Sequence, residues 1–245
     1  MNQEETVKIG GAGALIRFII LVLIFVGIIM VVVFSAPKNE DLSGIWDERT
    51  ILGNKDAKNH YVMTTDIMCP YCDYFSRAIM SEQEEFEKYL ADNDIVYEMR
   101  ITDFLNEYGE AGVYSENSAE AALCATEENK FWDFYHATMT ALDRDYHSKG
   151  VGNSKTAPHI TDITDEYWLN IGYSVGLSDR FTDCYKNHEQ LEHVRENTAK
   201  TAKIMQKSGQ SGMPYFKFNQ FETTGFDTSW GWDYVKKYLD AGLNS

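Results

Sequence analysis

The sequence has few basic residues for its length, and this shortage excludes one broad class of partner. Its 245 residues include 22 Lys and Arg against 38 Asp and Glu, a formal net charge of −16. A surface this acidic repels phosphate backbones and anionic lipid headgroups. We therefore expect no nucleic-acid partner, and we interpret the acidic excess as a solubility feature.

Cysteine is also scarce, and its distribution argues against a structural zinc site. Of the 4 cysteines, Cys69 and Cys72 form one close pair, whereas Cys124 and Cys184 are single and far apart. A tetrahedral zinc site needs four ligands, which usually come as two close pairs. We expect neither a bound metal nor a cofactor.

The close pair lies in a Cys-Pro-Tyr-Cys motif, which we interpret as a redox-active centre. A strand-like run from Tyr61 leads into the motif, and a helical pattern starts directly after it. Pro70 suits the first position of a helix, which places Cys69 at the helix N-terminus. Backbone N–H groups and the helix dipole stabilise a thiolate there. Cys72, one turn further on, should be more buried and able to reach back to Cys69. A static disulfide or half of a zinc site is the alternative.

A long apolar run near the N-terminus predicts a membrane anchor. Residues 18–34 are all apolar or glycine, and residues 14–16 extend the run past Arg17. This length spans a bilayer, with Arg17 reaching the interface. A cleaved signal peptide is the alternative, but its apolar core is usually about 7–15 residues, and Pro37 follows the best small residues here. We predict three N-terminal segments: a tail at 1–13, an uncleaved transmembrane anchor at 14–34 and a polar linker at 35–58.

Cysteine usage indicates the orientation of this anchor. Basic residues lie near both ends of the apolar run, so the positive-inside rule gives a tie. Four cysteines, two of them in a redox motif, fit an oxidising compartment. We therefore predict a single-pass protein of the cell membrane, with its catalytic domain on the extracytoplasmic side.

The remaining residues, 59–245, are expected to form one α/β domain. Residues 61–67 and 95–101 have strand patterns, and in the second the alternation directs Glu98 and Arg100 outward. Ser81 and Glu84 resemble a capping box that starts a helix. The expected order is strand, helix, strand, a helical insertion at about 108–186, a long helix, two strands and a final helix. This order describes a small mixed sheet with a helical insertion.

Three stretches of this domain together resemble DsbA-like thiol–disulfide oxidoreductases of the thioredoxin superfamily. The first stretch comprises residues 52–57 and 66–72, before and within the motif. The second comprises residues 122–125 and 130–132, and the third is residues 211–216. The last resembles the family's loop that ends in a cis-proline. The resemblance covers about residues 50–243 and implies a thioredoxin fold with a helical insertion.

The resemblance also implies roles for individual residues. Cys69 would be the nucleophile, and Cys72 would form a disulfide with it. Met213 and Pro214 would be joined by a cis peptide bond and would bind the backbone of the substrate beside Cys69.

Two departures from the family pattern bear on activity. The central dipeptide is Pro70-Tyr71, where the best-known strong oxidases have Pro-His, so a positive charge that favours the thiolate is missing. Met213 replaces a small or β-branched residue before the proline, which affects substrate selectivity.

Cys124 and Cys184 each lie in a helical pattern with apolar neighbours. Some family members have a second disulfide in the helical region, and an oxidising compartment favours one. The resemblance thus implies a structural Cys124–Cys184 disulfide. Two buried free thiols are the alternative.

Other polar residues have weaker signals. His188 and His193 are five positions apart, whereas the zinc-protease motif needs a spacing of four, so we expect solvated helix residues. Asp66 either influences proton transfer at the motif or caps a turn. We expect three aromatic residues of the insertion to belong to the core: Trp132, Phe134 and Tyr135.

The leading prediction is a thiol oxidase that introduces disulfides into exported proteins with free thiols. The resemblance implies reoxidation by a quinone-linked membrane partner of the DsbB or VKOR-like type. A reductase or isomerase with the same motif is the first alternative, since glutaredoxins share the Pro-Tyr dipeptide and have lower potentials than strong oxidases. The second alternative is a non-catalytic peptide-binding or chaperone-like module.

Overall fold

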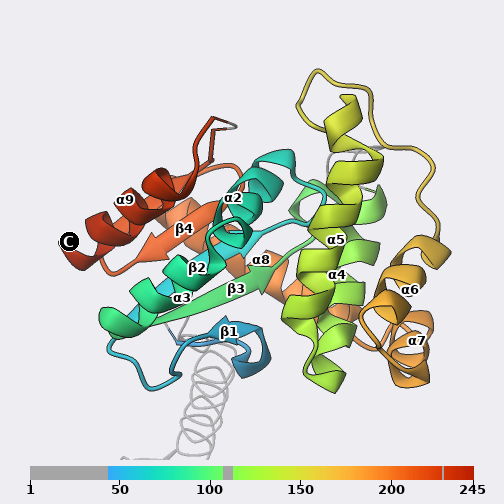
Figure 1. The fold of residues 1–245 in the computed structure, drawn as a ribbon, viewed down its shortest axis with the longest axis horizontal. Helices are drawn as coiled ribbons and strands as arrows, with labels where there is room; N and C mark the ends of the chain where they lie inside the picture. The colour runs from blue at the N-terminus through green and yellow to red at the C-terminus, as the bar shows by residue number, and fades with distance from the viewer. Residues whose placement is uncertain (1–43, 107–112, 228) are drawn as a thin grey trace, which may run out of the picture. The chain divides into compact units, whose positions relative to one another are not determined.

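The computed structural model describes residues 44–106, 113–227 and 229–245 (Figure 1). The predicted tail and anchor, residues 1–34, and linker residues 35–43 lie outside this part of the chain. Among the described residues, no helix combines the length and apolarity needed to cross a bilayer. The folded unit runs from Gly44 to Ser245.

A five-stranded mixed sheet forms the centre of the domain, in the order β1-β3-β2-β4-β5. β2 (Asn59–Thr65) and β3 (Ile95–Ile101) are parallel, with Tyr61 opposite Tyr97. Parallel neighbours need a long crossover connection, and helices provide it here. Three strands pair antiparallel with their neighbours: β1 (Ile51–Leu52), β4 (Tyr215–Phe218) and β5 (Phe221–Thr224).

Different helices cover the two faces of the sheet (Figure 1). On one face, aromatic rings fill the interface between the sheet and its helices. The ring centroids of Phe75 and Phe216 are 4.6 Å apart, and those of Phe86 and Tyr97 are 5.2 Å apart. On the opposite face α8 (Leu191–Ser208) crosses behind the strands. The first face is covered by α2 (Pro70–Met80), α3 (Gln83–Asp92) and α9 (Trp232–Leu243).

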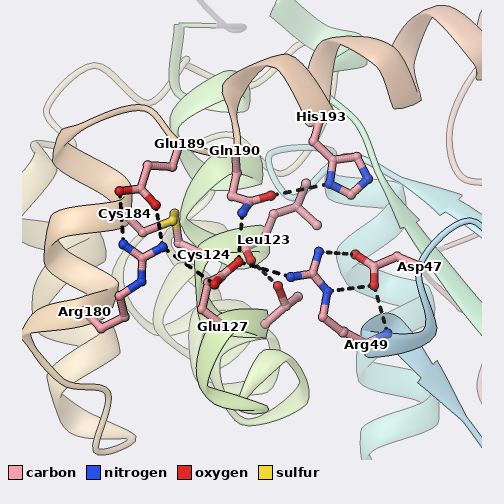
Figure 2. Close-up of polar contacts among 11 residues, drawn as sticks. Asp47, Arg49, Leu123, Cys124, Glu127, Arg180, Cys184, Glu189, Gln190 and His193 are labelled. Carbon is pink, nitrogen blue, oxygen red and sulfur yellow. Dashed lines mark hydrogen bonds and ion pairs between the residues drawn. A yellow bond between two sulfur atoms is a disulfide. The ribbon is translucent and has the colours of Figure 1, made fainter.

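The region between β3 and α8 is helical, as the sequence predicts. A disulfide between Cys124 and Cys184 joins its first helix to its last, and both cysteines are fully buried. Figure 2 shows this disulfide beside the ion pair between Arg180 and Glu189. The elements are α4 (Val113–Ala125), η3 (Thr126–Glu128), α5 (Phe131–Asp145), η4 (His147–Lys149), α6 (Asp165–Ser174) and α7 (Asp179–Lys186).

The segment 44–58 belongs to the folded domain, which corrects part of the predicted linker. It contains η1 (Glu48–Thr50) and β1, which pairs with β3. The Trp46 ring centroid lies 3.8 Å from the Arg100 guanidinium, and Arg49 donates a 3.1 Å hydrogen bond to Glu127 (Figure 2). The polar composition of this segment is typical of a linker, and the sequence does not show its attachment because Arg100 and Glu127, which hold it, lie far along the chain.

β3 is buried on both faces, so the predicted exposure of Glu98 and Arg100 is wrong. Their exposed fractions are 0% and 3%. Arg100 donates hydrogen bonds of 3.0 and 2.8 Å to Glu98, and His60 Nε2 lies 2.8 Å from the same carboxylate. Burial alone would raise the pKa of Glu98, but the hydrogen bonds from His60 and Arg100 lower it below its usual value. Alternation along a strand distinguishes its two faces without showing that one meets water.

One local prediction near a helix end is wrong, and another is right only in part. Ser81 closes α2 by donating a 3.1 Å hydrogen bond to the Ala78 carbonyl, and α3 starts at N-cap Glu82 without a side-chain cap. His193 lies in α8 and His188 is exposed, as expected, but His188 lies in the turn before that helix with a φ of 56°, where its Nδ1 is 2.9 Å from a Glu120 carboxylate oxygen. A hydroxyl that caps the preceding helix leaves no capping box for the next one.

Candidate active site

The Cys69–Cys72 motif forms the first turn of α2, as predicted. Cys69 is the N-cap residue, with φ −83° and ψ 118°, and Pro70 is the first helical residue. The N–H groups of Cys72 and Asp73 donate to the Cys69 carbonyl at 3.0 and 3.1 Å. Proline suits this position because the first N–H of a helix has no partner inside the helix. The motif therefore places Cys69 where the helix N–H groups are unpaired.

The two motif thiols differ in their access to solvent. Both cysteines are free thiols, with exposed fractions of 4% for Cys69 and 0% for Cys72. Burial raises the pKa of Cys72, and the neighbouring Cys69 raises it further. A substrate sulfur therefore reaches Cys69 first.

The loop before β4 meets the motif. The peptide bond between Met213 and Pro214 is cis, as the resemblance implies. The Cys69 thiol lies 3.8 Å from the Met213 carbonyl oxygen, which is 144 positions away in the chain. The Pro214 carbonyl accepts a 2.8 Å hydrogen bond from the Gly225 N–H. The structure thus brings together both motif cysteines and the predicted substrate-binding residues.

Tyr71, the other central residue of the motif, is half-buried. Its ring packs edge-on against Tyr74 with 6.4 Å between centroids. The Tyr74 hydroxyl donates a 3.2 Å hydrogen bond to the Asn153 carbonyl. This contact joins the start of α2 to the loop that follows η4.

Asp66 caps the turn that leads into the motif, one of the two roles expected for it. Its carboxylate accepts 2.8 Å hydrogen bonds from the N–H groups of Met68 and Leu105, and another from the Ser115 hydroxyl. The side chain is fully buried. Burial raises the pKa of Asp66 to about 6, although the hydrogen bonds from Ser115, Leu105 and Met68 lower it. The Asp66 carboxyl therefore changes its protonation state within the usual pH range of protein solutions.

We expect Asp66 to make the stability of the domain depend on pH. The pKa of Asp66 is about 6 in the folded state and about 3.9 in an unfolded chain, so its protonated carboxyl favours the folded state. This stabilisation of the fold is full below about pH 4 and is lost as the pH rises through about 6. The difference corresponds to about 3 kcal/mol. Relative to Asp66→Asn, the wild-type free energy of unfolding should fall by that amount between about pH 4 and pH 7.

Urea unfolding of both proteins across this pH range measures the effect. Asp233→Asn, at an exposed residue of α9, is the matched control and should show no such trend. A constant difference between wild type and Asp66→Asn at all pH values would contradict the prediction.

A buried carboxylate follows Cys72 directly, and its role was not predicted from the sequence. Asp73 is fully buried, and its Oδ2 lies 2.9 Å from His147 Nδ1 and 3.2 Å from an Arg77 nitrogen. His147 is also buried, at 3% exposure. Only the charge of Asp73 beside the motif was visible in the sequence, because His147 is 74 positions away.

Hydroxyl groups surround the Cys72 end of the motif. The Ser76 hydroxyl donates a 2.8 Å hydrogen bond to the Cys72 carbonyl and lies 2.6 Å from the Tyr135 hydroxyl. Tyr135 belongs to the core, as expected, at 1% exposure. Its contact with α2 gives it a polar role that the sequence did not suggest.

Several solved structures resemble this chain. BdbD from Bacillus subtilis is 18% identical, with a TM-score of 0.56 over 80% of this chain and 93% of that chain. MdbA, a thiol-disulfide oxidoreductase from Corynebacterium diphtheriae, is 20% identical, with a TM-score of 0.55 over 76% and 84%. The thiol-disulfide exchange protein α-DsbA2 from Wolbachia pipientis is 21% identical, with a TM-score of 0.53 over 78% and 85%. At these identities the likeness shows a thioredoxin-like α/β fold with a helical insertion.

The sequence comparison with protein families agrees with the fold. No match was found among curated proteins. A family model described as Thioredoxin matches residues 47–241, which is most of the folded domain. The chain therefore belongs to the thioredoxin family.

Proposed function

We propose that this protein is a thiol–disulfide oxidoreductase that introduces disulfides into exported proteins through Cys69 and Cys72. The observation that supports it best is the meeting of Cys69, at the start of α2, with the Met213 carbonyl at 3.8 Å. One slightly exposed sulfur and one buried sulfur at a helix N-terminus suit reversible exchange. The similar folds of MdbA, a thiol-disulfide oxidoreductase, and of the thiol-disulfide exchange protein α-DsbA2 support the same chemistry.

In the oxidising direction, a substrate thiolate attacks Cys69 Sγ of the Cys69–Cys72 disulfide. The bond between the two cysteines breaks, and its electron pair remains on Cys72. A second substrate thiolate then attacks the substrate sulfur bound to Cys69 and releases Cys69 as a thiolate. The substrate gains a disulfide, and the protein is left as a dithiol.

The Met213–Pro214 loop would hold the substrate during these steps. An extended substrate segment can pair with exposed backbone as an added strand, which aligns its sulfur without requiring one sequence. Met213 lies next to Cys69 and directly before β4. Backbone pairing at this place suits a protein that acts on many clients.

We further propose that residues 14–34 anchor the protein in the cell membrane, with the folded domain on the extracytoplasmic side. The apolar run, uninterrupted over residues 18–34, and the cysteine usage support this placement. Reoxidation of the dithiol then requires an electron acceptor, and a quinone-linked membrane partner of the DsbB or VKOR-like type would supply it. Since the folded unit starts at Gly44, residues 35–43 alone would connect it to the anchor.

One observation favours the opposite direction of transfer. Tyr71 carries no positive charge beside Cys69, where strong oxidases have histidine, and this favours a reductase or isomerase. The equilibrium of the full-length protein with glutathione distinguishes the two, with the Cys69–Cys72 state read by alkylation and mass spectrometry. We expect a potential above about −180 mV for an oxidase, whereas about −200 to −270 mV would indicate a reductase. A pair that never exchanges with glutathione would indicate a non-catalytic binding module.

A further inference from the structure

Asp73 is a buried carboxylate in the same helical turn as the redox pair. It follows Cys72 directly and lies in the first turn of α2, and its N–H donates a 3.1 Å hydrogen bond to the Cys69 carbonyl. The side chain is fully buried, so water and salt screen its charge little. The exchange reaction described above gives this carboxylate no role, although burying a charge is costly unless the charge is paired.

His147 and Arg77 hold the Asp73 carboxylate by one of its two oxygens. Oδ2 lies 2.9 Å from His147 Nδ1 and 3.2 Å from an Arg77 nitrogen. His147 is itself fixed, because its carbonyl accepts hydrogen bonds from the Gly150 N–H at 3.0 Å and from the Asn153 side chain at 3.1 Å. These contacts keep the carboxylate in place inside the protein, beside the motif.

The negative charge of Asp73 is only partly compensated. Arg77 also forms a 2.8 Å ion pair with Asp143, so one guanidinium serves two carboxylates. The second oxygen of Asp73, Oδ1, has no hydrogen-bond partner among the described residues. The three side chains of Asp73, Arg77 and Asp143 together carry one negative charge, next to the first turn of α2.

A thiolate on Cys69 needs the same end of this helix. Unpaired N–H groups and the dipole at a helix N-terminus stabilise anions, and the effect falls off within the first turn. Cys69 at the N-cap and Asp73 in the first turn both lie within that range. A like charge nearby disfavours the charged form of an ionisable group. The Asp73 carboxylate therefore opposes the charge that Cys69 acquires when the disulfide opens.

We propose that the Asp73 carboxylate, held by His147 and Arg77, lowers the reduction potential of the Cys69–Cys72 pair. The inference rests on the proposed function, because the potential matters only to a pair that exchanges. When two glutathione molecules reduce the disulfide, they supply two electrons and become glutathione disulfide. One of their two thiol protons goes to Cys72 and the other to solvent, which leaves Cys69 as a thiolate. Asp73 destabilises this charged product and so favours the disulfide form.

Removing single charges from the cluster tests the proposal in the full-length protein, with alkylation and mass spectrometry reading both forms of the pair. Asp73→Asn keeps the shape and removes the negative charge. Its equilibrium with glutathione should shift about tenfold toward the dithiol, a rise in potential of about 30 mV. Arg77→Gln removes the compensating positive charge and should shift the equilibrium toward the disulfide.

Asp143→Asn is the matched control, because it removes a carboxylate from the same arginine at a half-buried position on α5. Its equilibrium with glutathione should stay within about twofold of wild type, since ion pairs near the surface have small effects. The double variant Asp73→Asn/Arg77→Gln removes one charge of each sign and should also return close to wild type.

The opposite signs of the two single variants separate an effect of charge from damage to the fold. Asp73→Asn and Arg77→Gln break the same buried contact, so a merely structural role would shift both equilibria in the same direction. If Asp73→Asn does not fold, Arg77→Gln still decides, because an unchanged equilibrium or a shift toward the dithiol would overturn the proposal. An unchanged potential in folded Asp73→Asn would also overturn it, while wild-type exchange stands. Wild-type protein that does not react with glutathione would refute the proposed function itself.

Discussion

Cys72→Ser should trap substrate proteins on Cys69 as mixed disulfides, and Cys69→Ser should trap none. Cys69 is the sulfur with residual exposure, and Cys72 is fully enclosed. In Cys72→Ser the Cys69 thiolate attacks a substrate disulfide, which forms the mixed disulfide and releases the other substrate sulfur as a thiolate. Only Cys72 is placed to free the bound substrate from Cys69 within the protein. Without Cys72, the intermediate persists until a second external thiol arrives.

Non-reducing electrophoresis of full-length variants expressed with their native clients measures this asymmetry, and mass spectrometry locates the bonded cysteine. Both variants should lose catalytic turnover almost completely, because each lacks half of the redox pair. A variant with Cys124 and Cys184 replaced by Ala is the control, and it should trap nothing and still turn over. Equal trapping by Cys69→Ser and Cys72→Ser would contradict the assignment of the attacking sulfur.

Replacing both Cys124 and Cys184 by Ala should lower the free energy of unfolding by about 4 kcal/mol. The disulfide spans a sequence separation of 60, and closing so long a loop restricts the unfolded chain strongly. Both sulfurs are fully buried, so the bond is sealed from substrates and serves stability. The short helix α7 retains other contacts, including Phe181 against Phe134 at 5.4 Å between centroids.

Urea unfolding measures this loss, and the same experiment on wild type with only Cys69–Cys72 reduced provides the control. The double variant should still oxidise a model dithiol at a temperature where it is folded. A folded double variant without activity would instead make Cys124 and Cys184 part of an electron relay.

The chemistry at Cys69 is readable from the sequence because it depends on neighbours along the chain. A strand, a proline at the first helical position and two cysteines one turn apart place a sulfur at a helix N-terminus whatever the rest of the fold. The hydrogen bond between Asp66 and the Met68 N–H is equally local, since the two residues are two positions apart. Strand patterns likewise predicted β2 and β3 near their observed positions.

Only the tertiary structure decided which distant groups surround that sulfur. Met213 comes to Cys69 across 144 positions, and neither the Cys-Pro-Tyr-Cys motif nor the sequence around Met213 carries a mark of this meeting beyond a family resemblance. The polar segment 44–58 joins the sheet, and Glu98 and Arg100 are buried together, because their partners lie on other elements. Local patterns determine how a segment folds, whereas the packing of segments determines which side chains meet and which are kept from water.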